Sequence, residues 1–433
     1  MAGTQAEKIY DYITDEGEER SCKAISDDAC KEVSGNFFKN VLNGASTKLA
    51  EQLVSPGTTL PWIFGALGVP GGLAGALVPV KDAGSLLPQL FVSAKIRAFD
   101  RRKWFWVMSA FVQAMSMVAM AFVVLNSGGI TAGVLILLLL GIFSIASGVA
   151  SLAFKDVVAK TIPKGKRGQM LAMRATTGGI LTLIAGVWIN TTVKSDGNIW
   201  VFFGLIITAA VLWALAAIIF ANIKEEKGAT EGGKTPVKEL TDAWSFFRKD
   251  ANLRNFIFTR ALLMAIPLAQ PFFIIIGRQE VGSEVSSLGI IVVAAGIANI
   301  ISSPFWGRFS DKSSRIMMIL VAALGIVNIL IMASFPMWAG NLKNIYTFSL
   351  LLLIQVMAHG GARLSRKTYL VDFAPDKDRP LYVALSNTMI GLFTLIAAGF
   401  GVIATLFGLQ IMLLFYAALL VAAIILGLTL KDV

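Results

Sequence analysis

The sequence predicts an all-α polytopic membrane protein, and three observations carry that prediction. Of the 433 residues, 56% are hydrophobic and only 15% are charged, and the mean hydropathy is +0.71. A soluble protein of ordinary composition has roughly 25% charged residues. Several windows are nearly free of charge and reach the roughly 20 residues that a helix needs to cross about 30 Å of hydrocarbon. The alternating segments of a membrane β-barrel are not seen.

We predict twelve transmembrane helices. Their approximate limits are 38–66, 68–92, 104–125, 130–154, 170–192, 198–222, 253–277, 286–306, 315–338, 346–371, 381–405 and 407–430. A polar stretch separates the first six from the last six. The predicted organisation is an acidic cytoplasmic tail (1–35), a six-helix bundle (36–222), a cytoplasmic linker with an interfacial helix (223–250) and a second six-helix bundle (251–433).

The loops between these helices alternate sharply in charge. Residues 93–103 and 155–168 each hold five lysines or arginines, whereas the loops on the other side hold only Lys194, Arg278 and Lys343 between them. Cytoplasmic loops are the ones enriched in Lys and Arg. We therefore place both termini in the cytoplasm and the protein in the cell (inner) membrane. The net charge of +11 sets topology, and we expect no nucleic-acid partner.

The tail differs from the rest of the chain. Residues 1–35 hold nine acidic and four basic residues, with no apolar region typical of a signal peptide. Its Cys22 and Cys30 have a spacing that fits no common metal motif, so we expect two free, reduced thiols. The tail is either a plug at the cytoplasmic mouth or a solvated extension.

The chain matches itself when it is shifted by 212 residues. Four polar residues of the first predicted helix fall on four of the seventh: Asn40, Asn43, Thr47 and Lys48 on Asn252, Asn255, Thr259 and Arg260. The stretch "KDVVAKTIPKGKRG" at 155–168 falls on "KTYLVDFAPDKDRP" at 367–380 without a gap. The two halves are therefore parallel repeats, and transporters built in this way bind substrate between the repeats.

The loop "GRFSDKSSR" resembles the signature G-x-x-x-D-[RK]-x-G-[RK] of the major facilitator superfamily, and "IPKGKRG" and "APDKDRP" resemble its loops after the fourth and tenth helices. The resemblance covers about residues 36 to 430. It implies two parallel six-helix repeats that work by alternating access, with a cytoplasmic gate formed by the loop acids and their basic neighbours. The gate residues that it implies are Asp100, Arg101, Asp311, Lys312, Arg315, Arg167 and Arg379.

Several charges lie inside the predicted spans. Lys48 lies about 15 Å inward from Phe38, near the bilayer midplane. Such a charge costs at least a few kcal/mol, so it faces a cavity or a partner. Because cations outnumber acids there, and guanidinium groups suit carboxylate or phosphate, we expect an anionic substrate. The candidate substrate ligands are Lys48, Lys81, Arg260, Arg363, Gln52 and Gln270.

The intramembrane acids leave two alternatives open. Glu51 and Asp82, together with His359, are candidates for proton coupling, since a buried carboxyl can titrate near neutral pH. Alternatively, Glu51 neutralises Lys48 and Asp82 neutralises Lys81, which leaves only the arginines for an anion. His359 is either a proton relay or a donor that packs helices together.

The sequence thus predicts a secondary active transporter of a small organic anion, carboxylate- or phosphate-bearing, with proton coupling as an open option. One alternative is an exporter or flippase of a lipid or amphipathic compound. Another is a receptor or scaffold that does not transport. We expect no enzyme activity, because the chain has one histidine and no catalytic motif. We also expect no cofactor and no metal, and a monomer whose partners are the substrate and the lipid bilayer.

Overall fold

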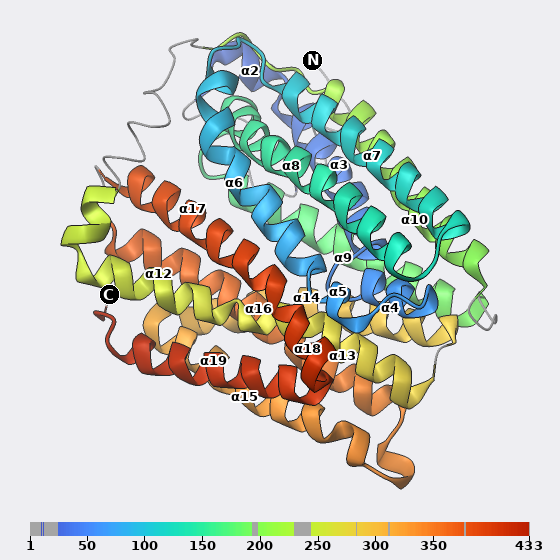
Figure 1. Cartoon of the computed structure of the whole chain (residues 1–433). Helices are drawn as coiled ribbons and strands as arrows, with labels where there is room; N and C mark the ends of the chain where they lie inside the picture. The colour runs from blue at the N-terminus through green and yellow to red at the C-terminus, as the bar shows by residue number, and fades with distance from the viewer. Residues whose placement is uncertain are drawn as a thin grey trace.

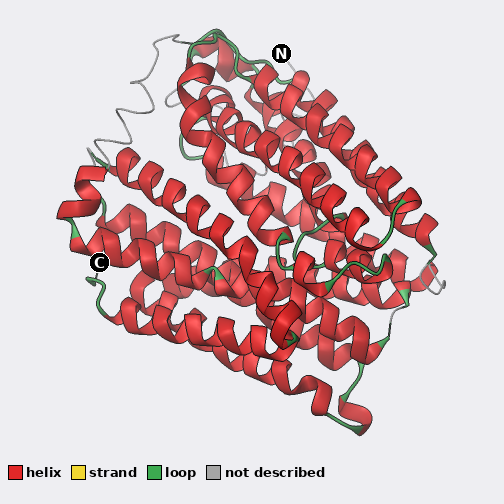
Figure 2. Ribbon diagram, in the orientation of Figure 1, coloured by secondary structure: helices red, strands yellow, loops and turns green. Residues whose placement is uncertain are grey.

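The computed structural model describes residues 10, 12, 25–192, 198–228, 244–282, 284–310, 312–375 and 378–432. These residues form helices and connecting loops, and no strand occurs among them (Figure 2). Most of the predicted linker, the gate residue Asp311 and the thiol of Cys22 lie outside the described residues. The predicted interfacial helix is described only over 244–249, which are helical.

The helices follow the predicted spans closely (Figure 1). The first half contains α2 (Asp27–Lys31), α3 (Val33–Leu53), α4 (Thr59–Ala66), α5 (Gly71–Ala74), α6 (Leu77–Arg97), α7 (Lys103–Asn126), α8 (Gly129–Thr161), α9 (Arg167–Thr192) and α10 (Ile199–Ala221). The second half contains α12 (Ala251–Leu263), α13 (Ala265–Val281), α14 (Val285–Ser310), α15 (Ser314–Ser334), α16 (Ile345–Phe373), α17 (Arg379–Ala397), α18 (Gly401–Phe407) and α19 (Leu409–Leu428). Three short 3₁₀ turns, η1 (Phe335–Met337), η2 (Gly340–Leu342) and η3 (Ala398–Phe400), connect some of them.

Within the described residues, ten stretches are long and apolar enough to span a membrane. The two remaining predicted spans, 38–66 and 68–92, correspond to α3 with α4 and to α5 with α6. Both carry the charges that the sequence placed inside the bilayer. The count of twelve helices is therefore met by ten apolar spans and two polar ones.

The first and seventh predicted helices are each broken, and prolines explain why. A proline cannot donate a hydrogen bond to the carbonyl four residues earlier. Pro56 frees the carbonyl of Gln52, which instead accepts a hydrogen bond from the Thr59 hydroxyl at 2.9 Å. Pro267 likewise removes the helical donor from the carbonyl of Leu263, the last residue of α12. Each of these spans is therefore two helices rather than one.

The two halves meet through two equivalent pairs of helices. Within the first half, α3 packs on α9 and α10, and α7 packs on α8 and α10. Within the second half, α15 packs on α16 and α19, and α12 packs on α19. Across the halves, α9 packs on α14 and α6 packs on α17. The two sets of helices lie closest together away from the termini and diverge toward the end where the C-terminus lies (Figure 1).

At the end opposite the termini, the two halves meet through a backbone contact and a cation–aromatic contact. A Cβ added at Gly401 of α18 would lie 2.0 Å from the carbonyl oxygen of Gly72 in α5. Nearby, the guanidinium carbon of Arg278 lies 5.9 Å from the centroid of the Trp62 ring. A cation over an aromatic face at this separation is attractive. These contacts join the first half to the second.

A third contact joins the halves along α9 and α14, where the Asn190 amide donates to the carbonyl of Ser286 at 3.0 Å. At the end near the termini, by contrast, no hydrogen bond or ion pair between described residues joins the two halves.

Two features of the tail differ from expectation. Tyr10 is fully buried, with its ring centroid 5.2 Å from that of Phe37 in α3, so this part of the tail is not a solvated extension. Cys30, in α2, is half of a disulfide. The expectation of two free thiols is therefore wrong, because a sequence spacing carries no information about how closely the chain brings two cysteines together.

The close approach of α5 and α18 gives a first prediction. We expect Gly401→Ala to lower the thermal stability by the equivalent of about 1 to 3 kcal/mol, because the added methyl overpacks the contact with the Gly72 carbonyl. The measurement is the melting temperature of the purified protein in detergent. Gly399→Ala is the matched control, since a Cβ at Gly399 meets nothing within 4 Å. Equal melting temperatures for the two variants would show that this contact does not hold the halves together.

Candidate functional site

A cavity of about 230 Å³ lies between the two halves. It is bordered by charged and polar residues of α3 and α6, by apolar residues of α7 and α8, and by residues of α9, α14 and α16. Its lining includes Lys48, Glu51, Gln52, Ser55, Lys81, Met117, Met120, Leu140, Phe143, Thr182, Asn299 and Arg363.

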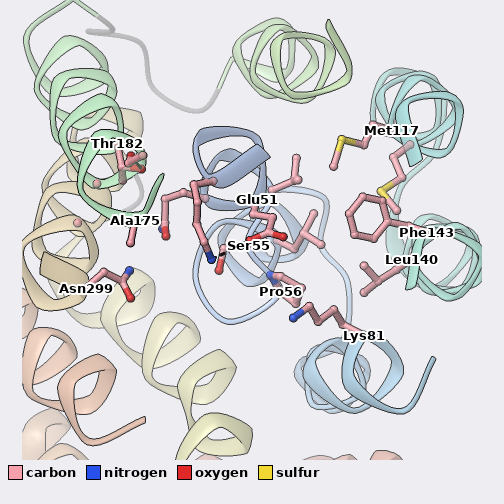
Figure 3. Close-up of a pocket in the computed structure, with 18 of the residues that line it drawn as sticks. Glu51, Ser55, Pro56, Lys81, Met117, Leu140, Phe143, Ala175, Thr182 and Asn299 are labelled. Carbon is pink, nitrogen blue, oxygen red and sulfur yellow. Dashed lines mark hydrogen bonds and ion pairs between the residues drawn. The ribbon is translucent and has the colours of Figure 1, made fainter. Parts of the chain in front are cut away.

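The cavity has chemically different walls (Figure 3). Met117, Leu140 and Phe143 form an apolar side, and Thr182 and Asn299 lie on the opposite side. The acidic and basic groups of α3 and α6 lie between these two sides. The cavity can therefore hold a molecule that has both an apolar part and a charged part.

A second cavity of about 150 Å³ adjoins the first, because the two share lining residues such as Gln52, Lys81 and Asn299. It adds three predicted site residues: Asp82 from α6, Gln270 from α13 and His359 from α16. Eight of the nine predicted substrate and coupling residues thus surround one pair of connected cavities, and the exception is Arg260.

Two of the three cations in the larger cavity are paired with acids. Lys48 Nζ lies 3.3 Å from a carboxylate oxygen of Glu51, and Lys81 Nζ lies 3.5 Å from one of Asp82. The side chains of the first pair are 48% and 44% exposed, so solvent reaches this bond. The internal neutralisation that the sequence left open is present here, in a form that a substrate can displace.

Arg363 is different. It lies in α16, is exposed to the larger cavity, and makes no hydrogen bond or ion pair with any described residue. A guanidinium group has five N–H donors and keeps its charge at all ordinary pH values. An unpaired group of this kind facing a cavity is a ready-made anion ligand.

Arg260, the sequence equivalent of Lys48, is instead buried. It is 6% exposed and lines neither central cavity. Its guanidinium donates to the Ser386 hydroxyl at 2.6 Å and to the amide oxygen of Asn387 at 2.9 Å, both in α17. In this state Arg260 joins α12 to α17, and its role as a substrate ligand stays a prediction.

The polar stripe of α3 is divided along its length. Asn40, Asn43 and Thr47 are buried within the first half, where the Asn43 amide donates to the carbonyl of Ala216 in α10 at 3.0 Å. Only the later residues of the helix, from Lys48 onward, reach the cavity. Asn43 therefore joins α3 to α10, and the Thr47 hydroxyl accepts a hydrogen bond from Arg174 of α9 at 3.4 Å, whereas Asn40 donates to the carbonyl of Asn36 in its own helix.

Apart from Asp311, which lies outside the described residues, the predicted gate residues lie at the end of the molecule near the termini. Arg167 donates to the carbonyls of Ile162 and Ala159, and Arg315 pairs with Asp432 at 3.3 Å. These partners all belong to the same half as the arginine. Of the other predicted gate residues, Asp100, Arg101 and Lys312 are exposed, and Arg379 begins α17. Their gating role stays a prediction.

Sequence reasoning missed two notable polar residues. Asn299 lines both cavities, and it could have been found as the single amide side chain in an otherwise apolar span. Glu225 follows α10, and its buried carboxylate accepts hydrogen bonds from the backbone N–H groups of Arg102 and Lys103 and from Lys160. No sequence signal distinguished it from the other charges of the linker.

Among the residues that the structure describes, no group of three histidine, cysteine or acidic side chains could hold a metal ion. The lining of the two cavities consists of charged, amide, hydroxyl, imidazole and apolar side chains.

Comparison with known proteins agrees with this geometry. The family profile described as Major Facilitator Superfamily matches residues 269–432. Uncharacterised proteins of Mycobacterium tuberculosis and Mycobacterium bovis are 20% identical over 367 residues, which is 82% of this chain and 68% of theirs.

Solved transporter structures share the fold. The nucleoside transporter NupG has a TM-score of 0.71 at 12% identity, over 91% of this chain and 99% of that one. A POT family transporter in complex with 5-aminolevulinic acid scores 0.65 at 12% identity, over 92% and 95%. The D-xylose-proton symporter scores 0.63 at 14% identity, over 93% and 98%. Identities this low establish a common fold and no more.

The ten apolar spans and the shared fold define a multi-pass membrane protein. The comparisons agree with the resemblance seen in the sequence: residues 269–432 match the profile of the major facilitator superfamily, and the chain shares its fold with solved transporters.

The contact of Arg260 with α17 gives a second prediction. We expect Asn387→Ala to cost about 1 to 3 kcal/mol of stability, because it removes an acceptor from a buried charged donor. Thr388→Ala is the control, since its hydroxyl bonds only the carbonyl of Ala384 in its own helix. Thermal melting of both proteins in detergent is the measurement. A melting temperature for Asn387→Ala no lower than that of the control would mean that the buried arginine does not depend on this bond.

Proposed function

We propose that this protein moves a small organic anion, bearing a carboxylate or phosphate group, across the cell membrane by alternating access. The single observation that carries the proposal is the Arg363 guanidinium, which faces the larger cavity without a partner among the described residues. Three cations and one acid line that cavity, so its charge favours an anion. The similar POT structure holding 5-aminolevulinic acid supports a small organic acid as a ligand of this fold.

The two ion pairs would take part in the transport cycle. An anion that approaches Arg363 competes with Glu51 for Lys48 and with Asp82 for Lys81. Either carboxylate, once displaced from its lysine, is a candidate to carry the proton. This exchange couples anion binding to proton uptake at Glu51 or Asp82, and His359 in the adjoining cavity is the further candidate.

The remaining parts of the proposal concern the frame. Both termini face the cytoplasm, the protein acts as a monomer, and the linker at 223–250 separates two bundles at 36–222 and 251–433. In the alternate state the gate residues near the termini, Asp100 and Asp311 foremost, close the cytoplasmic side. The unit proposed for closing the opposite side is the contact between Trp62 and Arg278.

An exporter of amphipathic compounds remains the second candidate. The apolar wall formed by Met117, Met120 and Phe143 favours it, since flexible thioethers adapt to ligands of different shape. In that case Arg363 would bind the charged headgroup. A thermal-shift screen over anionic metabolites and amphipathic compounds separates the two, because a ligand stabilises the folded state whatever its identity.

The role of Arg363 gives a third prediction. For the anion that the screen identifies, we expect Arg363→Gln to raise the Kd by about tenfold to a hundredfold, since a hydrogen bond to a charged group contributes about 1.5 to 3 kcal/mol. Binding is measured by titration and transport by uptake into proteoliposomes. Arg308→Gln, at an exposed arginine outside both cavities, is the charge-matched control. Near-normal anion transport by Arg363→Gln and by Arg260→Ala would remove the arginines as ligands.

Proton coupling gives a fourth prediction. We expect Glu51→Gln to abolish accumulation of the anion driven by a proton gradient while exchange of labelled for unlabelled anion continues, because the amide cannot carry the proton. Both modes are measured in the same proteoliposomes. Glu284→Gln, an exposed acid far from the cavity, is the control. Gradient-driven accumulation that persists in Glu51→Gln would leave Asp82 and His359 as the coupling candidates.

A further inference from the structure

An apolar cavity of about 250 Å³ lies within the second half, away from the central site. It is bounded by α12, α13, α17, η3 and α19. Its lining is Phe258, Ala261, Leu262, Met264, Ala265, Leu268, Phe393, Thr394, Ile396, Ala397, Phe400, Leu419 and Leu426. Phe258 and Ile396 at its edge are 41% and 64% exposed, so the cavity reaches the surface that faces the bilayer.

A basic residue lies on the same helix face as this cavity. On α12, Arg254, Phe258 and Leu262 are spaced at intervals of four, which places them on one face, with Arg254 nearer the helix start. The rise of a helix separates Arg254 from Leu262 by about 12 Å along the axis. That arrangement puts a cation at the membrane surface and an apolar void directly below it.

Three cations gather at this surface without a carboxylate partner. Arg248, Lys249 and Arg254 make no ion pair with any described residue. The nearby Asp250 carboxylate is already engaged, because it caps α12 through two backbone N–H groups and accepts from the Tyr382 hydroxyl at 2.9 Å. The positive charge of Arg248, Lys249 and Arg254, which together we call the basic corner, is therefore available to an anion from outside the protein.

Aromatic rings link the basic corner to the cavity. Trp244 stacks on Phe247 with ring centroids 5.0 Å apart, Phe247 lies 6.4 Å from Phe258, and Phe258 lies 5.7 Å from Phe393. Arg254 donates to the carbonyls of Phe247 and Arg248, which fixes residues 244–249 beside the start of α12. Tryptophan beside basic residues is typical of the membrane interface.

We propose that this corner binds one anionic glycerophospholipid, with its phosphate at Arg248, Lys249 and Arg254 and an acyl chain in the apolar cavity. The charges supply attraction for the phosphate, as basic clusters at a membrane surface do. The acyl chain gains no hydrophobic free energy by moving from the bilayer into the cavity, since the lipid tails around it are as apolar as the cavity lining. It gains packing contacts, because the residues around a void lack neighbours on one side.

The position of the cavity gives this lipid a structural consequence. Met264 lines it and also separates α12 from α13, and its sulfur accepts a hydrogen bond from Arg366 at 3.3 Å. An acyl chain bound in the apolar cavity fills the space beside the break between α12, which carries Arg260, and α13. The inference concerns a bound lipid and stands whether or not the transported substrate is the proposed anion.

Native mass spectrometry tests whether the basic residues bind the lipid phosphate. The full-length protein is titrated with phosphatidylglycerol or with phosphatidylcholine of the same acyl chains. We expect one phosphatidylglycerol to bind more tightly than phosphatidylcholine. Arg248→Gln with Lys249→Gln should weaken phosphatidylglycerol binding about 30-fold and leave phosphatidylcholine binding unchanged. Arg254 is left intact because its backbone contacts support the fold.

The matched control for charge is Lys164→Gln with Lys227→Gln, two exposed lysines of the first half. Equal affinity of the unmodified protein for the two lipids would overturn the proposal, and so would equal phosphatidylglycerol binding by the two double variants.

The apolar part is tested by filling the cavity. Ala261→Phe, or Ala261→Leu if the larger variant does not elute as a single species, should remove this tight-binding phosphatidylglycerol. Val211→Phe, at a 60% exposed position of α10, is the control and should retain it. Retention of the lipid by a folded Ala261 variant would show that the chain does not enter the cavity.

Discussion

The cost of placing charge in hydrocarbon is the constraint on which this structure depends. A lysine or arginine in the middle of a membrane helix is stable only if it meets water, an acid or a hydrogen-bonding neighbour. The helices that carry such residues, α3, α6, α12 and α16, therefore cannot turn those faces to lipid. They surround a pair of connected cavities or bind one another, and the apolar helices α7, α10, α15 and α19 supply much of the surface that lipid covers.

The two duplicated halves stabilise their intramembrane cations in different ways. Lys48 and Arg260 occupy equivalent positions in the two repeats, yet Lys48 reaches water beside Glu51 while Arg260 is enclosed by Ser386 and Asn387. The planar guanidinium can satisfy several donors against neutral oxygens, whereas a lysine ammonium is more strongly hydrated. Duplication thus supplied a common frame, and substitution gave one half a solvated ion pair and the other a buried link between helices.

Breaks in the helices recur at the same places as these charged groups. Pro56 and Pro267 interrupt the helical hydrogen bonding close to the ends of α3 and α12, and the Thr59 hydroxyl replaces the lost donor at the Gln52 carbonyl. Near the first break lies the central site, and near the second lies the apolar cavity that we assign to a lipid chain. A helix interrupted beside a cavity can change its direction with little loss of packing, as movement between two states of a transporter requires.

The sequence by itself determined the membrane class, the number and limits of the spans, and the duplication, because hydrophobic length and a fixed repeat offset are properties of the chain alone. It also predicted which charged residues lie at membrane depth, and in the structure most of these line the two adjoining cavities. Only the tertiary structure decided which of those charges are paired, that Arg363 faces the cavity unpaired, that Cys30 is in a disulfide, and that Asn299 belongs to the site. These contacts depend on how each helix is rotated against helices that are distant in the sequence. The pattern of residues along one helix shows which of its own residues share a face, but it does not show which face of another helix lies opposite.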